Sequence, residues 1–135
     1  MPLELEFIEA DGYLHMKVRG ENNLQSVLDY AAEAYRECER RNCWKLLIEE
    51  NLQGPAMTIT DVYHAASRGT ERVGRPVVVA FVDVNPLHPK QNVEFAGKVA
   101  LNRGLNIRVF DNLPDAQAWI AKVSAPPVLP PPDRS

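Results

Sequence analysis

The chain has 135 residues, of which 45% are hydrophobic and 24% charged, a composition typical of one globular domain with its own core. Its formal net charge of −3 argues against a nucleic-acid-binding surface, and no apolar run approaches the roughly 20 residues of a membrane-spanning helix. The acidic, alternating N-terminal segment is unlike a signal or transit peptide. We therefore expect a cytoplasmic protein without a membrane span and without a nucleic-acid partner.

Two cysteines, Cys38 and Cys43, are too few for a disulfide framework, and their spacing lacks the second ligand pair of a zinc site. We therefore expect them to be buried free thiols. The chain also lacks the local motifs of nucleotide-binding loops, of serine hydrolases and of zinc proteases. Local motifs thus predict no catalytic residue, no metal ligand and no cofactor.

The first elements are predicted from alternation and helical periodicity. Apolar residues alternate with polar ones around residues 3–7 and 14–18, which predicts two strands joined at Asp11-Gly12 by a type I′ hairpin turn. An amphipathic helix is expected to follow from an asparagine cap at residues 22–23, and Asn42 suits the left-handed position at its end.

The rest of the chain alternates strands with helices. The expected elements are a strand at 44–48, a helix capped by Thr58 or Thr60 with Ile59, Val62, Tyr63, Ala66 and Thr70 inward, a strand at 77–82, a helix at about 89–103, a strand at 107–110 and a helix capped by Asn112. This order, ββαβαβαβα, predicts an α/β domain over residues 1–123, with a five-stranded mixed sheet and four helices. The proline-rich residues 124–135 are expected to be a disordered tail.

Polar side chains gather where the third and fourth strands are expected to end. Glu49, Glu50 and Asn51 follow one strand, and Asp83, Asn85 and His88 follow the other. Ligands of open α/β sheets bind at the carboxyl ends of the strands, so this arrangement can form a carboxylate pair with a histidine that binds a metal or shuttles a proton. Alternatively, these acids are solvated or cap the next helix.

The second helix offers two further candidate features. Thr58 and Thr60 lie at its N-terminus, where free N–H groups stabilise an anion or a phosphorylated threonine; ordinary N-capping explains the same residues. His64 and Arg68, with Arg72 and Arg75 beyond, form either a basic stripe for an acidic partner or a solvated helix face. The aromatic residues Trp44, Tyr63 and Phe81 can line an apolar cavity or simply belong to the core.

Four segments in this order resemble the SpoIIAA-like domain, the fold of STAS anti-sigma-factor antagonists: the hairpin EADGYLHMKVRG, the long first helix, the strand VVVAFVD and the ending IRVFDNLPDAQAWIAK. The last segment resembles an uncharacterised branch of that family. The resemblance covers residues 3–123 and implies the SpoIIAA-like fold. Family antagonists carry an Asp-x-Ser-Gly motif whose serine is phosphorylated, whereas residues 50–55 here read ENLQGP without a serine.

Three functions follow as hypotheses. The leading one is a non-enzymatic regulatory or protein-interaction domain, whose surface comprises the second helix and the loops at 50–60 and 83–90. The alternatives are a carrier of a small apolar or anionic ligand and a small hydrolase or metal-dependent enzyme, which requires Glu49, Glu50, Asp83 and His88 to converge. A homodimer through a free sheet edge is a further possibility. The candidate ligand- or partner-binding residues are Glu50, Asn51, Gly54, Thr58, Thr60, His64, Arg68, Asp83 and His88.

Overall fold

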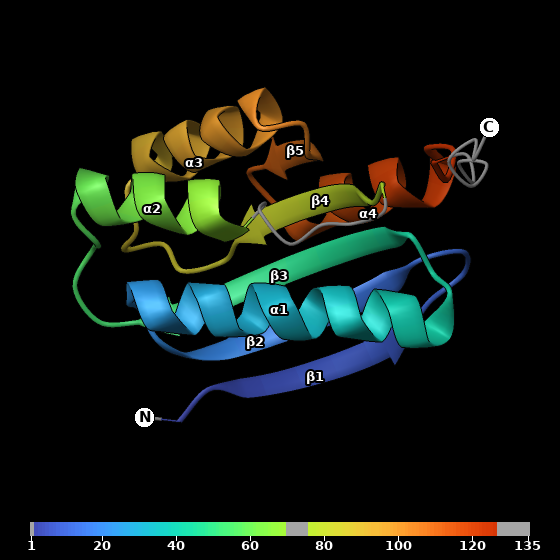
Figure 1. The fold of residues 1–135 in the computed structure, drawn as a ribbon, viewed down its shortest axis with the longest axis horizontal. Coiled ribbons are helices and arrows are strands. Elements are labelled where there is room, and N and C mark those ends of the chain that lie inside the picture. The colour runs from blue at the N-terminus through green and yellow to red at the C-terminus, as the bar shows by residue number, and fades with distance from the viewer. Residues whose placement is uncertain (1, 70–75, 127–135) are drawn as a thin grey trace, which may run out of the picture.

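A computed structural model describes residues 2–69 and 76–126 of the chain (Figure 1). The elements in chain order are β1 (Glu4–Glu9), β2 (Leu14–Glu21), α1 (Leu24–Arg41), β3 (Lys45–Gln53), α2 (Ile59–Gly69), β4 (Val78–Asp83), α3 (Lys90–Asn102), β5 (Asn106–Phe110) and α4 (Leu113–Lys122). The predicted α/β class, the order ββαβαβαβα and the five-stranded mixed sheet with four helices are confirmed.

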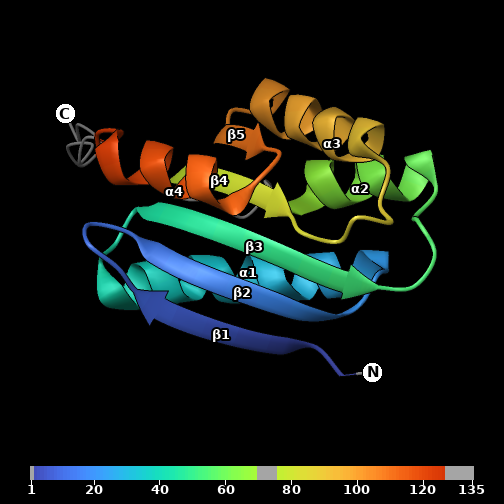
Figure 2. The ribbon, with the colours of Figure 1, turned by 180° about the vertical axis from the view of Figure 1, so that it is seen from behind.

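The strands lie side by side in sequence order, β1-β2-β3-β4-β5, with β1 antiparallel to β2 and the other neighbours parallel. Crossovers between parallel strands are right-handed, so an order that advances in one direction places every crossover helix on the same face. Accordingly, α1, α2 and α3 cover one face of the sheet, while α4 lies on the other face against β3, β4 and β5 (Figures 1 and 2).

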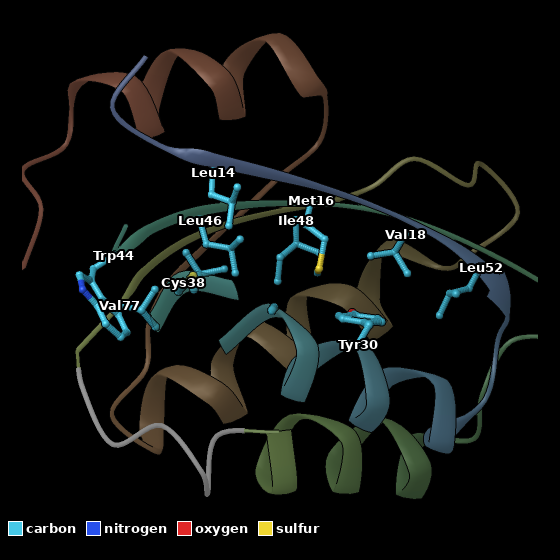
Figure 3. Close-up of a cluster of buried hydrophobic side chains, with 12 residues drawn as sticks. Leu14, Met16, Val18, Tyr30, Cys38, Trp44, Leu46, Ile48, Leu52 and Val77 are labelled. Carbon is cyan, nitrogen blue, oxygen red and sulfur yellow. The ribbon is translucent and has the colours of Figure 1, made fainter. Parts of the chain in front are cut away.

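Each face of the sheet has its own apolar core. On the α1 side, side chains of β2 and β3 such as Met16 and Ile48 point toward α1, with Trp44 at one end of the row and Leu52 at the other (Figure 3). On the α4 side, Leu47 and alternate residues of β4, Val78, Ala80 and Val82, pack in one cluster with Ile120. Because both layers cover β4, this strand is apolar on both faces, as its sequence predicts.

The hairpin and the end of α1 show where glycine and asparagine shape the chain. Gly12 has a φ of 83°, and the Ala10 N–H donates to the Tyr13 carbonyl over 2.9 Å. Among the described residues Asn42, with a φ of 51°, is the one non-glycine with positive φ. The predicted left-handed Asn42 is therefore confirmed. The predicted type I′ turn is wrong, because it requires positive φ at Asp11 as well.

Strand β3 is longer than predicted, since it continues from the expected end at residue 48 to Gln53. The charges of Glu49 and Glu50 suggested the end of a strand. In the structure β2 pairs in parallel with β3 as far as Gln53, and Leu52 is fully buried. The backbone pairing and the burial of every second side chain outweigh the two charges. The polar residues therefore belong to the strand rather than to a loop.

Helix α2 is capped as predicted but rotated relative to the predicted inward stripe. Thr58 Oγ1 accepts the Asp61 N–H over 3.1 Å, so Thr58 is the cap and Thr60 lies within the helix. Val62 is buried as expected, whereas Ile59 and Tyr63 are 55% and 39% exposed and were wrongly placed inward. Packing between α1 and α3 buries Val62, Ala65 and Ser67 instead. Thr70, Arg72 and Arg75 lie outside the described residues.

The end of the domain follows the prediction closely. Asn112 Oδ1 accepts the Asp115 N–H over 2.9 Å at the start of α4, and Ala116 and Ile120 are fully buried. The expected disordered tail falls largely on residues 127–135, which lie outside the described part of the chain. Within that described part, no helix combines the length and the apolar character that crossing a membrane requires.

Helix α3 lies so close to β5 at Gly97 that a methyl group does not fit there. A Cβ built on Gly97 would lie 2.7 Å from Val109 Cγ2, whereas one built on Gly69 in α2 would lie 3.9 Å from its nearest neighbour, Ala31 Cβ. We expect Gly97→Ala to lower the free energy of unfolding by about 1 kcal/mol, because overpacking outweighs the gain in helix propensity. The matched control Gly69→Ala should cause no loss. Urea denaturation of both variants checks this expectation. A Gly97→Ala variant as stable as the Gly69→Ala variant would contradict it.

Of the two thiols, Cys38 is fully buried and Cys43 half-buried. Burial raises the pKa of the Cys38 thiol to about 12, with smaller contributions from Cys43 and Glu37. Since the thiolate is the reactive form, we expect Cys38 to resist iodoacetamide at pH 8 in the folded protein and to react once urea unfolds it. Peptide mass spectrometry measures this directly. Labelling of Cys38 as fast as Cys43 in the folded protein would contradict the burial.

Candidate functional site

Three of the predicted site residues converge at the carboxyl ends of β3 and β4. Glu50 and Asp83 are register partners on these adjacent parallel strands, and His88 comes from the loop between β4 and α3. One carboxylate oxygen of Glu50, one of Asp83 and one ring nitrogen of His88 all lie within 4.8 Å of one another. We call Glu50, Asp83 and His88 the acid–histidine cluster.

Glu50 is a buried carboxyl group, only 7% exposed. The ring of Tyr30 in α1 belongs to the α1-side core (Figure 3). Its hydroxyl donates to Glu50 Oε2, so this core reaches the cluster. Burial raises the pKa of Glu50 to about 7; the Tyr30 hydrogen bond opposes the shift and the Asp83 charge adds to it. Burial, followed by the Glu50 charge, also raises the pKa of Tyr30 well above its ordinary value. Near neutral pH, Glu50 can therefore both hold and release a proton.

Asp83 and His88 form a second buried pair within the cluster. The His88 Nδ1 and Asp83 Oδ2 atoms are 2.6 Å apart, and each side chain is 7% exposed. Asp83 Oδ1 accepts the Asn85 N–H over 3.0 Å. The Asn85 side chain holds the loop in place, because its amide donates to the Leu52 carbonyl over 2.8 Å and its oxygen accepts the Leu87 N–H over 2.9 Å.

The other ring nitrogen of His88 is in an unusual position. His88 Nε2 is buried and has no hydrogen-bond partner within the described part of the chain. Leaving a polar atom buried and unpaired costs roughly 1–3 kcal/mol, so such atoms are rare and call for an explanation. A hollow of about 70 Å³ adjoins the cluster, with Glu50, Asp83 and His88 in its wall.

A larger, apolar hollow adjoins this one. It has a volume of about 140 Å³ and lies among α1, α2, α3 and the sheet. Met57, Val62, Phe81, Val93 and Ala96 line both hollows, so the two are neighbours. We call the larger one the apolar chamber; its remaining lining residues are Val27, Tyr30, Ala31, Ile48, Ala65, Ala66, Gly69, Gly97, Ala100, Leu105, Ile107 and Val109.

The structure does not bring the other predicted residues to the cluster. Glu49, required for the metal-enzyme hypothesis, bonds to His15 over 2.9 Å. Successive strand residues point to opposite faces, so Glu49 faces away from Glu50, and its predicted convergence is wrong. Asn51 accepts from Gln53, and Gly54 adopts a φ of 110° beyond the strand. Thr60, His64 and Arg68 are exposed on α2.

Sequence reasoning missed Tyr30 and the position of the cavity. Tyr30 lies three residues after Val27 and four before Ala34, so helical spacing places it on the inner face, and a buried tyrosine hydroxyl requires a partner such as Glu50. Of the three aromatic residues considered for a cavity wall, Phe81 lines the chamber. Trp44 packs edge-on against Tyr35 instead, and the Tyr63 hydroxyl accepts from Arg103 at the surface.

Fold and site together define an α/β domain with an apolar chamber that ends at a buried acid–histidine cluster. Comparisons with protein-family models, with curated proteins and with solved structures gave no match to this chain. The functional argument therefore rests on the geometry and chemistry of the cluster and the chamber.

Proposed function

We propose that the domain binds a small, largely apolar molecule in the chamber, with a polar head directed toward the acid–histidine cluster. The observation that carries this proposal is the chamber itself, about 140 Å³ in volume and lined almost entirely by apolar side chains. An engineered apolar cavity of roughly 150 Å³ in another protein binds benzene, so this volume suits a single ring or a short chain. The proposal corresponds to the carrier hypothesis drawn from the sequence.

The chemistry of the polar end favours some head groups over others. Glu50 and Asp83 are two carboxyl groups in one wall, and negative charge on them repels a carboxylate or phosphate head in a poorly solvated site. An amine or a hydroxyl can instead donate to Glu50 or Asp83. We therefore propose an amine or alcohol as the head group, and the anionic ligand considered from the sequence receives less support.

A matched series of one-ring compounds tests this proposal. Benzylamine, benzyl alcohol and benzoate have similar sizes and differ in the head group. We expect benzylamine and benzyl alcohol to bind with a dissociation constant of about 1 mM or below, as ligands of eight non-hydrogen atoms can, and benzoate at least tenfold more weakly. Ligand-observed NMR titration of the full chain at pH 7.5, after removal of metal with a chelator, measures all three.

A cavity-filling variant locates the binding. Ala96 lines both hollows, so Ala96→Leu should fill part of the chamber and weaken benzyl alcohol binding at least tenfold. Ala118 is exposed on α4, and Ala118→Leu makes the same chemical change away from the chamber. The control should bind as the unaltered chain does. Equal affinity in both variants, or a preference for benzoate, would contradict the proposal.

The regulatory or protein-interaction role and the SpoIIAA-like relationship remain predictions from the sequence. Ligand binding is compatible with both. A ligand in the chamber can shift the positions of the enclosing helices, and a partner that binds those helices can respond to the shift. The neighbouring surface includes Leu87, which is 83% exposed in the loop that carries His88.

A further inference from the structure

The acid–histidine cluster brings together the donor atoms of a metal site. Its three donors, two carboxylate oxygens and an imidazole nitrogen, lie within 4.8 Å of one another. Ligands around a tetrahedral ion with bonds of about 2.0–2.2 Å are separated by about 3.3–3.6 Å. Side-chain rotations that move the donor atoms by about an ångström therefore suffice for Glu50, Asp83 and His88 to bind one ion.

The unpartnered nitrogen of His88 independently points to a missing partner. His88 Nε2 is buried without a hydrogen bond in the described structure, although the His88 side chain lines the hollow beside Glu50 and Asp83. The hollow has a volume of about 70 Å³, several times the roughly 10–15 Å³ that one water requires. It can hold an ion together with one or two water ligands.

Hydrogen bonds from neighbouring groups orient the donor side chains of the cluster. Ligating side chains in metalloproteins are oriented by further hydrogen bonds. Here the Tyr30 hydroxyl orients Glu50, and the Asn85 N–H orients Asp83. Asp83 and His88 also line a wider hollow of about 420 Å³ beyond the ends of β4 and β5, which gives the cluster a second approach from the surface.

The geometry points to a binding site for one divalent transition-metal ion, held by Glu50, Asp83 and His88. Binding exchanges the hydrogen bond between Asp83 and His88 Nδ1 for bonds from both side chains to the ion. His88 Nε2–H then donates to a water in the hollow, as the second ring nitrogen of a ligating histidine does, and water completes the coordination. An imidazole among the donors favours ions such as Zn²⁺ over Mg²⁺ and Ca²⁺, which prefer oxygen ligands alone. The ion and the head group proposed for a chamber ligand meet the same carboxyl groups. Zinc binding is measured on the donors of the cluster and benzyl alcohol binding on the apolar wall of the chamber, so either proposal can fail alone.

The test uses the full chain after removal of metal with a chelator, with ZnCl₂ as the probe. Isothermal titration calorimetry should show one equivalent bound, with a dissociation constant in the micromolar range or below. The chain has three histidines, so ¹⁵N-labelled imidazole spectra can assign the ligand. Zinc should shift the ring resonances of His88 and leave those of His15 and His64 in place.

Two variants complete the test. His88→Asn retains a donor to Asp83 but removes the imidazole, and we expect it to weaken zinc binding at least about 100-fold. His15 is a buried histidine that bonds to Glu49, and the control His15→Gln keeps a donor to that partner and should bind zinc as the unaltered chain does. Absence of saturable binding, an unshifted His88 ring, or equal affinity in both variants would overturn the proposal. The imidazole spectra decide the question even if His88→Asn does not fold.

Discussion

Raising the pH from 5 to 8 is expected to lower the free energy of unfolding of the metal-free protein by roughly 2 to 3 kcal/mol through Glu50 alone. The cause is the burial of Glu50, which raises the pKa of its carboxyl group from 4.5 to about 7 in the folded protein. Between these two values the folded chain retains a proton that the unfolded chain has lost. The stabilisation is therefore complete below about pH 4.5 and is lost as the pH rises through 7.

The variant Glu50→Gln isolates this contribution. Its side chain is neutral at every pH and can still accept the Tyr30 hydroxyl bond, so the variant should lack this part of the pH dependence and exceed the unaltered chain in stability at pH 8. Glu39 is exposed on α1, and Glu39→Gln controls for the loss of one negative charge. Urea denaturation in a chelator at several pH values compares the three proteins. If the free energy of unfolding of Glu50→Gln changes with pH as steeply as that of the other two proteins, Glu50 is not the group that causes the pH dependence.

Replacing His88 by alanine is expected to destabilise the metal-free protein by about 3 kcal/mol at pH 7.5. His88 and Asp83 bond over 2.6 Å and each is only 7% exposed, so the variant leaves a buried carboxyl group without its partner. Leaving a buried polar group without its hydrogen-bond partner costs roughly 1–3 kcal/mol, and more for a charged group, and the remaining bond from the Asn85 N–H limits the loss here.

A surface histidine provides the comparison for this effect. His64 is exposed on α2, and His64→Ala should change the free energy of unfolding by no more than about 0.5 kcal/mol. His88→Asn should recover part of the loss, because its amide can donate to Asp83. Chemical denaturation followed by circular dichroism measures the three variants. If His88→Ala lowers the free energy of unfolding no more than His64→Ala does, the pair of Asp83 and His88 contributes nothing to stability.

The fold was predictable because periodicity and capping agree along most of the chain. The αL conformation of Asn42 and the cap formed by Asn112 and Asp115 follow from local chemistry alone. The length of β3 was not predictable in the same way. Glu50 and Leu52 are held in the strand by pairing with β2, and that neighbour is set by tertiary structure rather than by local sequence.

The site was predictable in part, for a topological reason. Parallel neighbours end at the same edge of the sheet, so Glu50 and Asp83 were expected to meet, and they do. The period of two in a strand could have excluded Glu49, because adjacent residues cannot both face the same cavity. The chamber could not be predicted, since its volume depends on how closely three helices approach the sheet at small residues such as Ala96 and Gly97.

Contacts between benzyl alcohol and methyl groups of the folded chain test the central proposal most directly. Nuclear Overhauser effects from the ring protons should reach the methyl groups of Ala66, Val62 and Ile107, which line the chamber. Leu87 and Leu101 are exposed, at 83% and 55%, and serve as surface references. The proposal predicts effects to the chamber methyl groups and none to these two leucines; effects confined to the leucines, or no effects at all, would contradict it.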